Sequence, residues 1–184
     1  MNNDLWRIKD FRILILGQSI CVLGDWFGII AILALAGFRW QVTPVKMSMV
    51  LFVIIAPIVF FGPLGGVIAD RTDRGRMLAA AGAMRAIVML FIANVGEFYL
   101  LLFFLLLLGV LTACSTPAKN AKIKEIPPLD LVDDAVFYSS FVDQAARVFG
   151  PALGGSALAF FSVETALYFN AAAYFLGSVV FAFM

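Results

Sequence analysis

Long apolar runs separated by short polar segments dominate the chain and predict six membrane-spanning helices. The runs cover residues 13–37, 47–69, 77–95, 98–117, 134–161 and 165–184. Each is long enough to cross the hydrocarbon core of a bilayer, which takes roughly 20 mostly apolar residues. Residues 119–133 form the longest polar connection. We therefore expect an all-α membrane protein whose residues 1–184 form a single six-helix bundle.

Positive charge gathers on one side of this predicted bundle. The segment before the first run, the second-to-third connection and the fourth-to-fifth connection carry Arg7, Lys9, Arg12, Arg71, Arg74, Arg76, Lys119, Lys122 and Lys124. The opposite connections contribute Arg39 and Lys46. Because Lys and Arg concentrate in cytoplasmic loops, we expect the N-terminus on the cytoplasmic side. An even number of spans returns the C-terminus to that side.

Composition supports the membrane assignment and narrows the function classes. The chain is 63% hydrophobic and 14% charged, with a mean hydropathy of +1.01 and no histidine. Cys21 and Cys114 both fall inside apolar runs, so neither a metal site nor a cofactor site nor a disulfide framework is expected. Ser156 follows two glycines, but it lacks the second flanking glycine and the histidine of a serine hydrolase. We predict neither an enzyme nor a nucleic-acid partner.

The most informative stretch begins at the end of the second run, where small residues four apart lead into a charge cluster. Gly62 and Gly66 share one helix face and would let a neighbouring backbone approach closely. Asp70 continues that face, where it is expected to meet an Arg or the N-terminus of the next helix. A cytoplasmic gate is predicted from Gly62, Gly66, Asp70, Arg71, Arg74 and Arg76. The alternative is an ordinary positively charged loop.

A short motif recurs in the second and fifth runs. Residues 61–66, Phe-Gly-Pro-Leu-Gly-Gly, return one residue longer as residues 149–155, Phe-Gly-Pro-Ala-Leu-Gly-Gly. The two helices cross in opposite directions, as an inverted repeat of three plus three helices requires. Gly150, Pro151 and Gly154 are expected to serve helix packing. Chance recurrence of Gly-Pro and Gly-Gly is the alternative.

Ionisable residues inside the runs are costly in a bilayer and need a partner or water. Asp25 lies near the middle of the first run, two turns after Gln18 on the same face. Asp25 is predicted either to couple protons and face a substrate cavity or to form a structural pair with Arg85. Arg85 is equally a candidate for anion contact. Trp26, next to Asp25, is a candidate wall of the cavity.

Two further ionisable residues occupy the fifth run. Asp143 and Arg147 are four residues apart, so the sequence predicts that they pair along their own helix. Because they lie toward the cytoplasmic end, a structural pair and a gate contact are both open interpretations.

Several motifs, in the same order along the chain, resemble the drug and siderophore exporter branch of the major facilitator superfamily. They are Gly24-Asp25-Trp26, Asp-Arg-Thr-Asp-Arg at residues 70–74, Thr-Pro-Ala-Lys-Asn-Ala at residues 116–121, and Arg147 ahead of Gly150-Pro151. Macrolide efflux proteins and the enterobactin exporter belong to this branch. Two departures are Asp73, where the general loop pattern has Gly, and Gly82, where the branch often has an acid three residues before Arg85.

The resemblance implies an N-terminal half of a twelve-helix transporter in a bacterial-type cytoplasmic (inner) membrane. Such a protein would be a proton-coupled antiporter for multidrug or siderophore efflux, exporting amphipathic small molecules. Its expected partners are the lipid bilayer, a small-molecule substrate, and a C-terminal six-helix half or a second copy of the chain. The alternatives are a natural half-size transporter acting as a homodimer and an inactive truncated fragment or membrane scaffold.

Overall fold

The computed structural model describes residues 4–184, and these residues form helices without any strand. The long helices are α1 (Lys9–Ala34), α2 (Pro44–Arg71), α3 (Arg74–Ala93), α4 (Phe98–Glu125), α5 (Val132–Phe160) and α6 (Val163–Ala182). Shorter pieces are η1 (Leu5–Arg7), the π-helical continuation of α1 called η2 (Leu35–Arg39), and η3 (Leu129–Leu131). The predicted six-helix, all-α bundle is confirmed.

Local capping fixes where several helices begin. The hydroxyl of Thr43 accepts a hydrogen bond from the backbone N–H of Lys46, ahead of a proline at the first helical position of α2. Asp73 caps α3 and Ser162 caps α6 in the same way, three residues before the donor. These short polar side chains satisfy backbone donors that a helix start leaves free.

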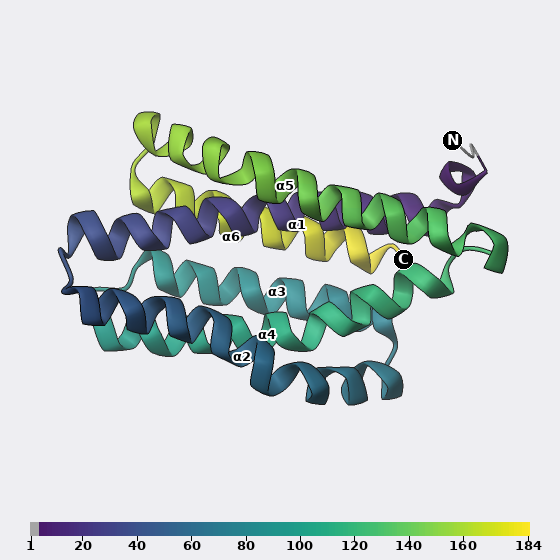
Figure 1. Ribbon diagram of the computed structural model, residues 1–184, viewed down its shortest axis with the longest axis horizontal. Coiled ribbons are helices and arrows are strands. Elements are labelled where there is room, and N and C mark those ends of the chain that lie inside the picture. Colours follow the sequence, from purple (N-terminus) through teal and green to yellow (C-terminus); the bar gives the residue numbers. More distant parts are fainter. Residues whose placement is uncertain (1–3) are drawn as a thin grey trace.

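Five of the six helices are long and apolar enough to cross a membrane, within the part of the chain that the structure describes. The other one, α5, has 29 residues but carries Asp143 and Arg147 among them. It runs beside α1 along the length of the bundle (Figure 1). The described chain therefore has five candidate membrane spans, and the charged α5 packs beside one of them.

The fourth helix continues to Glu125, whereas the sequence predicted its end near Pro117. Pro117 cannot donate a hydrogen bond to the carbonyl of Ala113, yet the helix tolerates it. That carbonyl lies against Gly65 of α2, where a Cβ atom would come within 2.6 Å of the Ala113 oxygen. A neighbouring helix can thus cover the carbonyl that a proline leaves free.

The helices pack in an order that differs from their order in the chain. The central helix α1 packs against α5 and α6, α4 packs against α2 and α3, and α3 packs against α6. Exchanging the first three helices with the last three maps the α1–α5 contact onto α4–α2 and the α1–α6 contact onto α4–α3, and it leaves the α3–α6 contact unchanged. This exchange symmetry is the arrangement that an inverted repeat produces, and it agrees with the repeated motif in α2 and α5.

The last two glycines of the repeated motif take equivalent places in their two helices, whereas the first differ, since Gly62 has no neighbour and Gly150 lies against Trp26. Gly65 of α2 meets the backbone of α4, and Gly154 of α5 meets Ile30 and the backbone of Trp26 on α1. Gly66, which follows Gly65, faces open space, as does its counterpart in α5. Gly62 also faces open space, so neither Gly62 nor Gly66 packs against another helix within residues 4–184, and Gly65 makes the close approach to α4. Packing at Gly62 and Gly66 stays a prediction.

Both ends of the chain and two of the connections lie at the same end of the bundle. Figure 1 places the N-terminus, the C-terminus, the α2–α3 link and the α4–α5 link together. The basic residues of the α2–α3 link and of the end of α4 therefore share one end, while Arg39 lies at the other. The positive charges that the sequence assigns to one side thus lie mainly at one end of the bundle.

Candidate functional site

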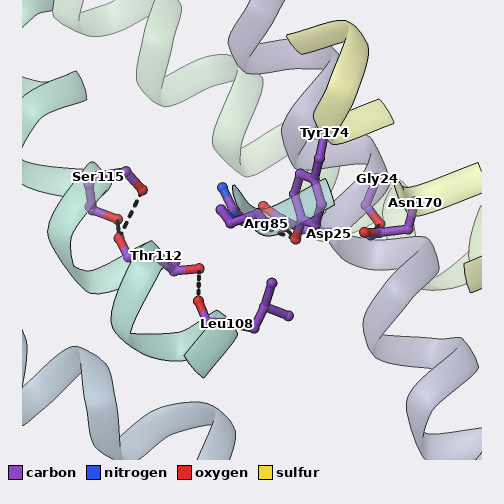
Figure 2. A network of polar contacts seen from close by, with 9 residues as sticks. Gly24, Asp25, Arg85, Leu108, Thr112, Ser115, Asn170 and Tyr174 are labelled. Atoms are coloured by element: carbon purple, nitrogen blue, oxygen red, sulfur yellow. Dashed lines mark hydrogen bonds and ion pairs between the residues drawn. The ribbon is translucent and has the colours of Figure 1, made fainter. Parts of the chain in front are cut away.

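Three side chains from three helices meet in the middle of the bundle. Nη2 of Arg85 on α3 lies 2.7 Å from Oδ1 of Asp25 on α1. The same nitrogen donates to the hydroxyl of Tyr174 on α6 at 2.9 Å, and that hydroxyl donates to Asp25. The guanidinium carbon also stands 4.1 Å from the centre of the Tyr174 ring. The predicted pairing of Asp25 with Arg85 is confirmed, and Figure 2 shows the three groups pointing toward one another.

The three members of this centre differ in exposure. Arg85 and Tyr174 are buried, with 8% and 2% of their surfaces exposed. The side chain of Asp25 keeps 32% of its surface accessible. The carboxylate is therefore held by two buried partners and still reachable from the adjoining cavity.

Beside this centre, Asn170 fastens α6 to α1. Its amide donates a hydrogen bond to the backbone carbonyl of Gly24, and the residue is fully buried. One turn further along α6, the hydroxyl of Tyr174 donates to Asp25, and two turns further Ser178 donates to the carbonyl of Ala79. The sequence analysis missed Asn170, Tyr174 and Ser178, because neutral polar side chains are less conspicuous than charges in an apolar run. Their spacing of four residues was the signal that could have identified them.

A second polar cluster ties α1 to α4 and α5. The amide of Gln18 donates to Oδ1 of Asp143 at 2.7 Å, and its oxygen accepts from the hydroxyl of Ser139 at 2.9 Å. Lys119 of α4 donates to Oδ2 of Asp143 at 2.9 Å. Gln18 thus belongs to this cluster, and it also lines a small cavity of about 90 Å³ together with Asp25.

The ion pair of Asp143 corrects a prediction. Within residues 4–184 the carboxylate pairs with Lys119, whereas the sequence predicted Arg147 as its partner. Lys119 was placed in a loop because the fourth helix was expected to end at Pro117. The helix continues instead, and this extension carries the lysine up to Asp143. Arg147 is exposed and has no ion pair in the described part of the chain.

A cavity of about 370 Å³ opens beside both clusters. Asp25, Arg85, Asp143 and Arg147 contribute to its wall, together with Trp26. Most of the remaining lining is aliphatic, from Val22, Ile29, Ile32, Ile54, Ile58, Met89, Leu105 and Leu108. Thr112 of α4, seen opposite Asp25 in Figure 2, lines it as well. The four charged residues singled out from sequence therefore share one cavity.

Close packing of α5 on α1 seats the tryptophan of this cavity. Gly150 lies directly against the indole of Trp26, so a larger side chain would displace the ring. Pro151 follows inside α5, and Gly154 continues the contact one turn on. The predicted packing glycines of α5 thus also hold one wall of the cavity.

The α2–α3 link forms an ionic cluster at the end of the bundle that holds the termini. Arg74 lies 3.4 Å from Asp70 and 3.1 Å from Glu125 at the end of α4. Asp73 accepts a hydrogen bond from the backbone N–H of Arg76 at 2.8 Å, which lowers the pKa of its carboxyl below the usual value. Arg71 and Arg76 are exposed. Asp70 therefore forms an ion pair with an arginine, while Asp73 caps the N-terminus of α3.

Comparison with known proteins agrees with this architecture. The model of a family described as transmembrane secretion effector, MFS_3, matches residues 5–184. The chain belongs to the major facilitator superfamily. It is 36% identical to the MFS-type transporter YfiS of Bacillus subtilis, over 100% of this chain and 44% of the relative. It is 28% identical to the staphyloferrin A transporter of Staphylococcus aureus, over 84% of this chain and 40% of the relative.

Membership of the superfamily places the bundle among membrane transporters, a class of proteins that is distinct from enzymes. The chain spans less than half the length of either curated relative. Its six helices correspond to one bundle of the superfamily fold, and residues from all six of them line its cavity.

Proposed function

We propose that this bundle is the N-terminal half of a proton-coupled secondary exporter of amphipathic small molecules, such as drugs or siderophores. The observation that supports this proposal is the environment of Asp25. Its carboxylate is hydrogen-bonded to Arg85 and Tyr174 and is still accessible from a largely aliphatic cavity. The relative named as a staphyloferrin A transporter supports the siderophore class. Substrate would bind between this bundle and a second one, and the two would rock against each other.

In this proposal Asp25 carries the proton. A proton bound at Asp25 removes the charge that Arg85 faces at 2.7 Å, so the guanidinium loses its fixed anion and interacts more strongly with other groups in the cavity. Loss of the proton restores the ion pair. The ionised carboxylate of Asp25 and a substrate thereby compete for one arginine, so proton binding at Asp25 and substrate binding at Arg85 are linked.

The cluster around Arg74 is proposed as the cytoplasmic latch of the same cycle. Arg74 connects the α2–α3 link to Glu125 of α4, and Arg71 and Arg76 remain exposed for contacts with the second bundle. Asp143 and Lys119 connect α5 to α4 at the same end. Rocking of the bundles would make and break contacts here, whereas the Asp25 centre stays inside one bundle.

The test uses the reading frame that contains this chain, extended to the length of its relatives and reconstituted in liposomes with an imposed pH gradient. Uptake of the cationic dye Hoechst 33342 and of an anionic naphthalene sulfonate would be followed in parallel. Asp25→Asn is expected to abolish uptake driven by the gradient and to leave passive exchange of dye. Asp130→Asn, an exposed acid in the α4–α5 link, is the matched control. Unchanged gradient-driven uptake in Asp25→Asn would disprove the coupling role.

A half-size transporter that works as a homodimer is the second candidate, favoured by the many exposed apolar residues of α2 and α5. Light scattering corrected for bound detergent gives the mass of the 184-residue protein. A monodisperse dimer would support this candidate, and a monomer would contradict it.

A further inference from the structure

We propose that the substrate of this cavity is an amphipathic anion, whose acidic group is bound by Arg147, with Arg85 in the same cavity wall. This inference rests on the proposed export function and names the chemical class of its substrate. It excludes hydrophobic amines, which carry the opposite charge, as preferred substrates.

The first argument is the balance of charge around the cavity. Asp25 is paired with Arg85, and Asp143 is paired with Lys119. Arg147 lines the same cavity and has no ion pair in residues 4–184. The charged groups that line the cavity or touch its lining therefore carry one excess positive charge. An arginine at this depth of a membrane needs an anion or water, and a charged substrate supplies the anion.

The second argument is an unused donor on Arg85. Its Nε atom is buried and has no hydrogen-bond partner among the described residues, although Nη2 serves both Asp25 and Tyr174. Buried donors are normally satisfied, and an unsatisfied one usually indicates a ligand, a water molecule or strain. The guanidinium of Arg147, which has no ion pair in residues 4–184, presents its donors in a fork that matches the paired oxygens of a carboxylate, sulfonate or phosphate.

The third argument is the rest of the cavity wall, which fits an apolar body. Ile29, Ile32, Ile54, Ile58, Leu105 and Leu108 surround the charged groups. Trp26 adds an aromatic face, and Gly150 fixes its position. Ligand pockets commonly combine such apolar walls with a few polar groups that set the orientation. The cavity thus selects a molecule with one acidic end and a hydrophobic remainder.

The experiment measures binding of two matched probes to the 184-residue protein in phosphatidylcholine nanodiscs. The probes are 1-anilinonaphthalene-8-sulfonate and N-phenyl-1-naphthylamine, which share a ring system but differ in the sulfonate. Replacing Trp6 and Trp40 by Phe leaves Trp26 as the only tryptophan. Energy transfer from Trp26 to the dye then reports binding in the cavity.

We expect the sulfonate to bind more tightly than the neutral probe and Arg147→Gln to weaken its binding at least about tenfold, as expected for loss of a charge-assisted hydrogen bond. Binding of the neutral probe should change less than about twofold. Arg147→Lys should retain part of the affinity. Arg12→Gln, which removes an exposed arginine of α1 outside the cavity, should change neither probe. Circular dichroism confirms that each variant is folded.

Three results would overturn the inference. Equal binding of the two probes would show that the acidic group is not recognised. Unchanged sulfonate binding in Arg147→Gln would show that this arginine serves another partner, such as an acid outside this chain. Loss of the difference between wild type and Arg147→Gln after phosphatidylglycerol is added would assign the site to a lipid headgroup. None of these readouts needs transport, so the inference stands or falls separately from the coupling role of Asp25.

Discussion

Nζ of Lys119 lies 2.9 Å from Oδ2 of Asp143, joining two consecutive helices across the cavity side of the bundle. Because the lysine and the aspartate are 18% and 34% exposed, the pair lies between surface and buried ion pairs in character. Lys119→Met would leave the carboxylate without its cation, and we expect a loss of about 1–3 kcal/mol of stability.

The double variant tests this explanation. Asp143→Asn keeps an oxygen for Gln18, so Lys119→Met combined with Asp143→Asn should recover much of the lost stability. The measurement is the midpoint of thermal unfolding in detergent, followed by a thiol-reactive dye at the free residues Cys21 and Cys114. About 2–4 °C of shift is expected for each kcal/mol. Equal midpoints for Lys119→Met and the double variant would contradict the pairing.

Neighbouring glycines of α2 provide a matched pair for the packing of α2 on α4. A Cβ atom at Gly65 would lie 2.6 Å from the Ala113 oxygen and 2.7 Å from the Cys114 Cα, and backbone cannot easily move aside. Gly65→Leu should therefore destabilise the bundle by about 1–3 kcal/mol or more. Gly66→Leu enters open space and should change stability by less than about 0.5 kcal/mol. A larger effect at Gly66 than at Gly65 would contradict the observed register.

Removal of the Tyr174 hydroxyl should weaken the central ionic group. Tyr174→Phe loses the hydrogen bonds to Asp25 and from Arg85 but keeps the ring 4.1 Å from the guanidinium. We expect a loss of about 1.5–3 kcal/mol, typical of hydrogen bonds to charged groups. Tyr174→Leu also removes the aromatic face and should cost about 1 kcal/mol more. Equal midpoints for Tyr174→Phe and wild type would show that the hydroxyl adds nothing to stability.

Acidic pH should destabilise the N-terminus of α3, because it protonates the capping carboxylate of Asp73. The Arg76 N–H lowers the pKa of this carboxyl in the folded protein, so the ionised cap stabilises the fold at neutral pH. That contribution is lost as the pH falls below about 4 and through the folded-state pKa. Asp73→Asn keeps a hydrogen-bond acceptor without a titrating charge. The difference in unfolding midpoint between wild type and Asp73→Asn should therefore shrink between neutral pH and pH of about 3, and parallel curves would contradict this.

Hydropathy was sufficient to predict the number and approximate limits of the helices. It was not sufficient at Pro117, because proline normally ends helices in water, whereas in this bundle Gly65 packs over the carbonyl that the proline leaves free. The same limit applies to register. Gly62, Gly65 and Gly66 all occur in α2, and spacing alone cannot tell which of them faces a neighbour.

The charged residues of the candidate site could be predicted from the sequence, because charges are conspicuous in apolar runs. Asp25 and Arg85 are charged residues that are costly in a membrane, so the presence of each predicted the other as its partner. Asp143 was equally conspicuous, but its partner Lys119 lies on the helical extension that the sequence placed in a loop. Tyr174 was missed because its hydroxyl is only a small polar part of an aromatic side chain.

The exchange of contacts between the two halves of the bundle has a consequence for biosynthesis. The helix α1 packs mainly on α5 and α6, which leave the ribosome after the other four long helices of this bundle. Arg85 follows Asp25 by 60 residues and Tyr174 follows it by 149. At roughly 5–20 residues per second, the nascent carboxylate spends several seconds without its arginine and about 7–30 s without its tyrosine. Of the six long helices, α1 is made first but completes its packing only when α6 is made, so α1 depends on its surroundings at the translocon until then.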